Sequence, residues 1–162
     1  MRRDGFEIKH LILALIFVLV AGVLQNTDIL NIYGIKPNIT LTVLLTLSFA
    51  ITSLSHYLFL LLIAAVLLKF EIGLEATNLV FIVLALIGFF INRKVSGEAF
   101  FNNLFLIAGA TLFFYLLVDI NFLYQNILTV FWEMLYNISL GALVYFSSHR
   151  FLPYEKAFRI TF

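Results

Sequence analysis

The feature that most constrains this chain is a run of about 30 residues, Ile39 to Leu68, without a single Asp, Glu, Lys or Arg. The rest of the 162-residue chain is similar, because 63% of its residues are hydrophobic and only 12% are charged. Soluble domains carry roughly 25% charged residues, which help to cover the large surface that a domain of this size exposes. The composition therefore predicts a membrane protein. It excludes a soluble enzyme, a nucleic-acid-binding domain, a disordered tail and a disulfide scaffold.

The same run indicates how many helices cross the membrane. One crossing needs about 20 residues, so the run is too long for one upright helix and short for two. Its most polar point, from Thr52 to His56, predicts a tight turn between two helices. We therefore expect an all-helical bundle in a single membrane domain over residues 1–162, with six spans at about 11–26, 38–54, 57–72, 78–92, 103–119 and 127–147.

The distribution of basic residues favours six spans. Lys and Arg near the ends of membrane helices concentrate on the cytoplasmic side. Six spans place only Lys36 and Lys69 outside, and they place both termini inside with eight basic residues: Arg2, Arg3, Lys9, Arg93, Lys94, Arg150, Lys156 and Arg159. A single helix over the long run would give five spans, with four basic residues inside and six outside. No small-x-small cleavage site follows the first apolar run, so we expect the first helix to be retained.

Polar residues recur on one face of the last expected helix. Thr129, Glu133, Asn137 and Gly141 follow one another at intervals of four, which places them on one side of a helix. Glu133 is the carboxylate inside an apolar run, and an ionisable residue within a span is a functional candidate. Three interpretations are open: packing against a neighbouring helix, contact with a partner, or ion or proton coupling.

The second expected helix carries hydroxyl groups at Thr42, Thr46 and Ser53. Hydroxyl groups are tolerated in lipid because they bond back to carbonyl oxygens of their own helix. One interpretation of this face is therefore purely local. The alternative is that it meets the stripe around Glu133.

The sequence contains no arrangement typical of catalysis or metal binding. It has no cysteine, and its three histidines lack metal-ligand spacing such as His-x-x-x-His. The Gly-x-Ser-x-Gly, Walker and His-Glu-x-x-His motifs are missing too. We therefore expect no enzyme activity, no metal and no cofactor. The charged cluster Lys69, Glu71 and Glu75 is either a solvated group of ion pairs or a surface for a partner.

Three short sequence motifs lie inside the apolar runs or directly next to them. They are Gln25 at the end of the first run, Lys36-Pro37-Asn38 before the second, and Phe131-Trp132 followed by Asn137 in the last. In this order they resemble the rod shape-determining protein MreD family. In that family a glutamine typically ends the first helix, an Arg-Pro-Asn or Arg-Pro-Asp element opens the second, and an aromatic pair precedes an asparagine in the last. The chain departs from the family in its third helix, where Leu61 and Ala65 replace glycines and Lys69 replaces an aspartate.

The resemblance implies a six-helix protein of the bacterial cytoplasmic membrane with both termini inside. It also implies a non-catalytic scaffold that helps to control cell shape and lateral peptidoglycan synthesis in cell-wall elongation. Such a scaffold binds a bitopic partner similar to MreC and, through it, the actin-like MreB and wall synthases. The alternative is the substrate-binding component of an energy-coupling-factor transporter, which is also a small six-helix bundle. Trp132, the single tryptophan, counts against a vitamin site.

Overall fold

The computed structural model describes residues 8–68, 76–95 and 97–152, and these residues form helices without a strand. In chain order the helices are α1 (Ile8–Asn26), α2 (Ile39–Leu47), α3 (Leu54–Leu67), α4 (Ala76–Asn92), α5 (Ala99–Val118), α6 (Ile120–Gln125) and α7 (Ile127–His149). The all-helical class expected from the sequence is confirmed for this part of the chain.

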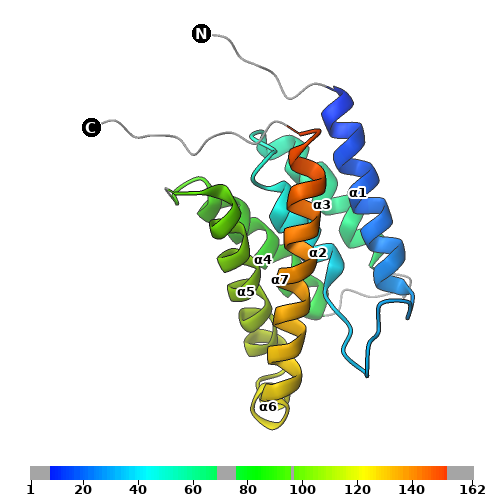
Figure 1. Cartoon of the computed structure of the whole chain (residues 1–162), viewed down its shortest axis with the longest axis vertical. Helices are drawn as coiled ribbons and strands as arrows, with labels where there is room; N and C mark the ends of the chain where they lie inside the picture. Colours follow the sequence, from blue (N-terminus) through cyan, green and yellow to red (C-terminus); the bar gives the residue numbers. More distant parts are fainter. Residues whose placement is uncertain (1–7, 69–75, 96, 153–162) are drawn as a thin grey trace.

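Three helices, α1, α5 and α7, are long and apolar enough to cross a membrane (Figure 1). They contain 19, 20 and 23 residues, which corresponds to lengths of about 28 to 35 Å. The hydrocarbon core of a bilayer is about 30 Å thick. α1 begins and α7 ends at the same end of the bundle, which we call the terminal end, and α6 lies at the opposite end.

α2 is much shorter than the span expected over residues 38–54, because it ends at Leu47. Its nine residues extend about 14 Å, half the thickness of a hydrocarbon core. Every residue of α2 is buried, since α1, α4, α5 and α7 all contact it. The expected continuous helix to residue 54 is therefore wrong. The structure has a short central helix enclosed by longer ones.

Hydrogen bonds hold the turn that follows α2. The Ser48 hydroxyl donates to the Leu45 carbonyl at 2.7 Å, and the Asn92 amide of α4 donates to the Ser48 carbonyl at 2.8 Å. These bonds occupy carbonyl oxygens that a helix end leaves without partners inside the helix. α3 then begins at Leu54, within the polar stretch that marked the expected turn. The turn itself lies earlier than expected because these contacts end α2 at Leu47.

The connection expected between Asp119 and Asn126 contains the short helix α6. The Asp119 carboxylate accepts a hydrogen bond from the Phe122 backbone N–H at 2.9 Å and so caps this helix. The Phe122 ring stacks on Tyr115 of α5, with 5.4 Å between the ring centroids. α5, α6 and α7 therefore form one hairpin, which projects beyond the end of α1 (Figure 1).

The core consists of apolar side chains packed around α2. Its fully buried members include Val18, Leu44, Leu47, Leu60 and Phe89. Tyr57 of α3 is also fully buried, and its ring stacks on Phe89 with 4.5 Å between centroids. Its hydroxyl donates to the Ala85 carbonyl at 3.0 Å, so this buried tyrosine joins α3 to α4 with its polar atom satisfied.

Gly141 lets α7 approach α2 and α5 closely. A Cβ at this position would overlap Cδ1 of Ile107 and lie 3.4 Å from Cγ2 of Thr42. We predict that Gly141→Leu forces these helices apart and destabilises the bundle by about 1–3 kcal/mol, the usual cost of overpacking. Gly109→Leu is the matched control, because no atom lies within 4 Å of a Cβ built there. Thermal unfolding in detergent should show a clearly lower Tm for Gly141→Leu. An equal loss in both variants would contradict the close approach.

Candidate functional site

The first turn of α2 is a buried helix start whose backbone N–H groups bond to side-chain oxygens. The Asn38 N–H donates to Oδ1 of Asn137 at 2.9 Å, and the Ile39 N–H donates to Oε1 of Gln25 at 2.7 Å. The Leu41 N–H donates to Oδ1 of Asn38, the capping residue, at 3.3 Å. A helix start leaves such donors without partners inside the helix. Side chains from α1, from α7 and from the cap satisfy them here. We call Gln25, Asn38 and Asn137 the α2 joint.

Asn137 also connects the α2 joint to α5. Its Nδ2 donates to Oγ1 of Thr111 at 3.1 Å, and the Thr111 hydroxyl donates onward to the Ile107 carbonyl at 2.9 Å. Asn137 is 1% exposed and Thr111 is 4% exposed, so these bonds form away from solvent. One amide group therefore links the start of α2 to both α5 and α7.

The contact between α5 and α7 has a regular antiparallel register. Each step moves four residues back along α5 and four residues forward along α7, so the contacts stack in layers along one face of each helix. Three layers are visible: the Tyr115 hydroxyl donates to the Glu133 carboxylate, Thr111 bonds to Asn137, and Ile107 lies against Gly141. We call this series of layers the α5–α7 ladder.

The stripe expected on the last helix lies mostly within this ladder. Glu133, Asn137 and Gly141 are buried, and Thr129 is half-buried. The hydrogen bonds of Glu133 and Asn137 described above run to α5 and to the start of α2. Among the interpretations left open by the sequence, this arrangement favours packing between helices of the same chain over direct contact with a partner.

The hydroxyl groups expected on one face of the second helix separate in the structure. Thr42 faces Gly141, so this part of α2 meets the stripe on α7. The Thr46 hydroxyl donates back to the Thr42 carbonyl at 2.9 Å. Ser53 lies beyond α2 in the turn, where its hydroxyl is 2.8 Å from that of Ser55. The interpretation of a bond within the same helix therefore applies to Thr46, and that of contact with the stripe on α7 applies to Thr42.

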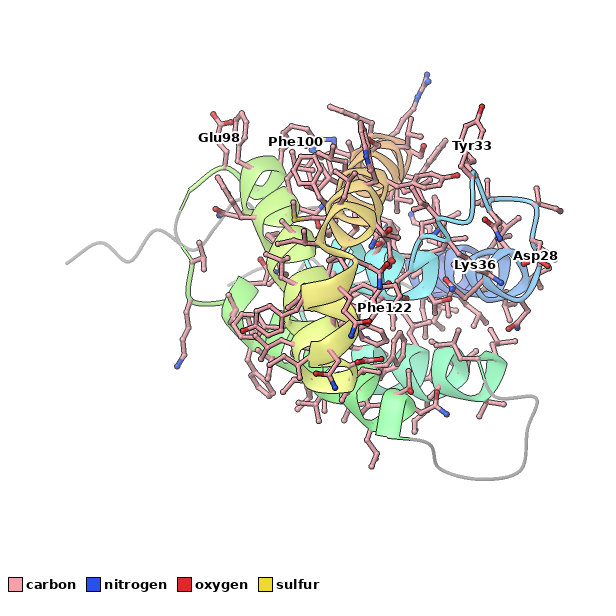
Figure 2. The ribbon with its side chains drawn as sticks, turned by 90° about the horizontal axis from the view of Figure 1, so that it is seen from below. Asp28, Tyr33, Lys36, Glu98, Phe100 and Phe122 are labelled. Carbon is pink, nitrogen blue, oxygen red and sulfur yellow. The ribbon has the colours of Figure 1, made fainter. Side chains whose placement is uncertain are left out.

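Of the residues that carry the MreD resemblance, three polar ones meet in the structure and the others lie apart from them. The polar side chains Gln25, Asn38 and Asn137 meet in the α2 joint. Lys36 lies outside it, where its ammonium group forms an ion pair with Asp28 at 3.3 Å on the surface of the loop (Figure 2). The remaining members are Pro37, directly before the cap, and the outward-facing Phe131 and Trp132, which are 45% and 51% exposed.

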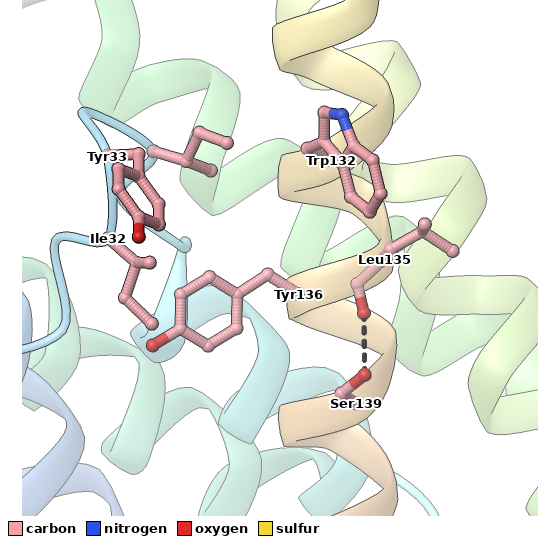
Figure 3. Close-up of a pocket in the computed structure, with 7 residues that line it drawn as sticks. Ile32, Tyr33, Trp132, Leu135, Tyr136 and Ser139 are labelled. Atoms are coloured by element: carbon pink, nitrogen blue, oxygen red, sulfur yellow. Dashed lines mark hydrogen bonds between the residues drawn. The ribbon is translucent and has the colours of Figure 1, made fainter.

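A groove separates the Ile32–Ile35 hairpin from α7 (Figure 3). Tyr33 and Gly34 in this hairpin have φ angles of 53° and 82°, the geometry of a type I′ turn, which a bulky residue rarely adopts. The turn holds the Tyr33 side chain fully exposed. The groove has a volume of about 710 Å³, and α7 contributes Trp132, Leu135, Tyr136 and Ser139 to its lining. This apolar and aromatic surface suits a hydrophobic ligand or helix.

The sequence interpretation missed the residues of α5 that complete the ladder. Asn103, Ile107, Thr111 and Tyr115 follow one another at intervals of four, the same spacing as the stripe on α7. This spacing is a signal that the sequence contains. No carboxylate or basic group accompanies it, so the residues did not stand out among the other threonines and aromatic residues of the apolar runs.

The described residues offer little for metal chemistry. Within residues 8–68, 76–95 and 97–152, no group of three or more His, Cys, Asp or Glu side chains could hold a metal ion. The charged cluster Lys69, Glu71 and Glu75 lies outside the described residues. The buried polar groups described above bond to one another, which is an arrangement that joins helices.

Comparison of the chain with protein-family models, with curated proteins and with solved structures finds no match. The fold and the site by themselves describe the following class of protein. Over its described residues it is an all-helical protein with three helices long and apolar enough to cross a membrane, in which buried and half-buried polar side chains join a short central helix to its neighbours.

The α2 joint predicts a loss of stability for Gln25→Leu. This variant leaves the Ile39 N–H without its acceptor, and a buried donor without a partner costs about 1–3 kcal/mol. Gln125→Leu is the matched control, because Gln125 is exposed at the end of α6. Thermal unfolding in detergent should give a lower Tm for Gln25→Leu. A Tm equal to that of the control would show that Gln25 does not support α2.

The bond between Tyr115 and Glu133 predicts that variants of the two residues are not additive. Tyr115→Phe and Glu133→Leu each leave the other side chain without its partner, so the double variant should lose less than the sum of the single losses, by about 0.5–3 kcal/mol. Glu133→Gln should be milder than Glu133→Leu, since its amide oxygen still accepts a hydrogen bond. Denaturation in detergent measures these energies, with Tyr124→Phe on the exposed face of α6 as the control. Additive losses would contradict the pairing.

Proposed function

We propose that this chain is a non-catalytic scaffold of the bacterial cytoplasmic membrane, of the kind that the MreD family represents. It crosses the membrane six times with both termini in the cytoplasm, and α2 with its flanking segments makes the second crossing. Its role is to bind a bitopic partner similar to MreC and so to help position the MreB-linked machinery of wall elongation.

The α2 joint is the observation that carries this proposal. Gln25, Asn38 and Asn137 come from three separate elements, and each element resembles its counterpart in the MreD family. Backbone-to-side-chain bonds of 2.7 and 2.9 Å bring these elements together at the start of one helix. Their convergence gives all three one structural purpose and supports a shared architecture.

The distribution of polar groups supports a scaffold as well. Glu133 and Asn137 are occupied by bonds within the bundle, and the outward faces of the helices are apolar. A partner helix therefore has an apolar surface to pack against. The groove beside the Ile32–Ile35 hairpin is a hollow in this surface, which Trp132 and Tyr136 of α7 line and into which Tyr136 points toward the hairpin.

The same groove favours the second candidate, a substrate-binding component of an energy-coupling-factor transporter. Its volume of about 710 Å³ lies within the range of small-molecule sites, roughly 300–1,000 Å³. In this role the groove holds a vitamin-sized ligand, and the chain associates with paired ATPases instead of a bitopic protein.

Purification of the tagged chain from native membranes in mild detergent, followed by mass spectrometry, distinguishes the two functions. We expect a bitopic coiled-coil protein to be recovered with it. Trp132→Ala should lower that recovery severalfold, because it removes the largest side chain of the groove. Leu143→Ala is the control, since Leu143 is 64% exposed on the same helix and does not line the groove.

One result would count against the scaffold, and another would count against the groove alone. Recovery of paired ATPases or of a bound vitamin would support the transporter component instead. Equal recovery of the bitopic protein with Trp132→Ala and Leu143→Ala would retain the scaffold but remove the groove as its binding surface.

A further inference from the structure

Asn103 of α5 is a buried polar side chain that the contacts described above do not explain. It is 0% exposed, and neither its Nδ2 nor its Oδ1 has a hydrogen-bond partner among the described residues. Buried amide groups in proteins are nearly always hydrogen-bonded, either to the protein or to ordered water. Asn103 therefore requires a ligand that the described side chains do not provide.

The register of the α5–α7 ladder shows what surrounds this amide. One more step of four residues beyond the Ile107–Gly141 layer brings Asn103 of α5 level with Tyr145 of α7, whose ring lies 5.4 Å from that of Phe100. α2 follows α7 in parallel, since Asn38 bonds to Asn137 and Thr42 faces Gly141, so the next step along α2 is Thr46. Thr46, Asn103 and Tyr145 are 0%, 0% and 8% exposed. We call these three residues the terminal layer, because it is the layer closest to the terminal end.

The chemistry of the terminal layer limits the ligand to a small neutral molecule. Thr46, Asn103 and Tyr145 carry no charge at neutral pH, and two titratable groups near Tyr145, Glu98 and His149, are exposed, so the layer supplies no buried counter-charge for an ion. The Asn103 amide offers both donors and an acceptor. The Thr46 hydroxyl already donates to the Thr42 carbonyl, but its oxygen can still accept a hydrogen bond. A buried molecule that donates and accepts two to four hydrogen bonds in a polar site is water.

We infer that the terminal layer binds water inside the bundle, with the Asn103 amide as its anchor. Asn103 lies about one turn from the start of α5, so water reaches the layer from the terminal end. In the Tyr115–Glu133 and Thr111–Asn137 layers the polar groups bond to one another, whereas the Ile107–Gly141 layer is apolar. The hydrated site is therefore confined to one end of the ladder. This inference does not depend on the proposed scaffold function.

Radiolytic hydroxyl labelling of the whole chain in detergent tests the site. Bound water is a local source of hydroxyl radicals, so Tyr145 should be labelled although it is buried. Tyr57 should stay unlabelled, because it is fully buried and its hydroxyl bonds to the Ala85 carbonyl. Asn103→Leu should reduce the labelling of Tyr145 severalfold. Asn102→Leu is the matched control, since it makes the same change one residue outside the ladder.

Two results would overturn the inference. If wild-type Tyr145 is as unreactive as Tyr57, the layer is dry, and this comparison needs no variant to fold. If Asn103→Leu has a higher Tm than Asn102→Leu, the amide is buried without water and the leucine relieves its cost. The expected result is a lower Tm for Asn103→Leu, because the bound water loses its anchor.

Discussion

A helix that begins inside an apolar bundle needs acceptors for its first backbone N–H groups, and the rest of this structure is arranged around that need. α2 is such a helix, nine residues long and buried throughout. Gln25 reaches it from the end of α1, and Asn137 reaches it from the middle of α7. The amide of Asn137 then extends the contact to Thr111 on α5. The positions of three long helices are thus fixed relative to one helix start.

The few polar side chains in the interior also determine how α5 and α7 pair. Apolar side chains alone allow two helices to slide past each other, because one aliphatic contact replaces another at little cost. In the α5–α7 ladder a shift of four residues would separate Tyr115 from Glu133 and Thr111 from Asn137, and it would bring a larger side chain than Gly141 against Ile107. Interhelical hydrogen bonds and small residues specify helix pairing in this way where the surroundings are as apolar as the helices themselves. The low charge content therefore coexists with a well-defined register.

The sequence predicted the parts of this structure that depend on local pattern. The all-helical class follows from the apolar runs, and the interval of four predicted that Glu133, Asn137 and Gly141 share one face. The end of α2 at Leu47 was not predictable, because the apolar run continues past it and the contact with Asn92 that helps to end the helix comes from α4. The α2 joint was beyond local pattern too, since Asn38 and Asn137 are 99 residues apart. The resemblance to MreD named its three members without indicating that they meet.

The long separation within the α2 joint has a consequence for biosynthesis. A ribosome delivers the chain from its N-terminus, so Gln25 is already present when Ile39 emerges, only 14 residues later. Asn137 follows Asn38 by 99 residues. During most of translation the start of α2 therefore has one of its two long-range acceptors, and its second N–H group depends on water or on temporary partners. The bundle is complete only when α7 has been added. A chain that stops before α7 therefore lacks a hydrogen-bond acceptor for its central helix as well as one of its long helices.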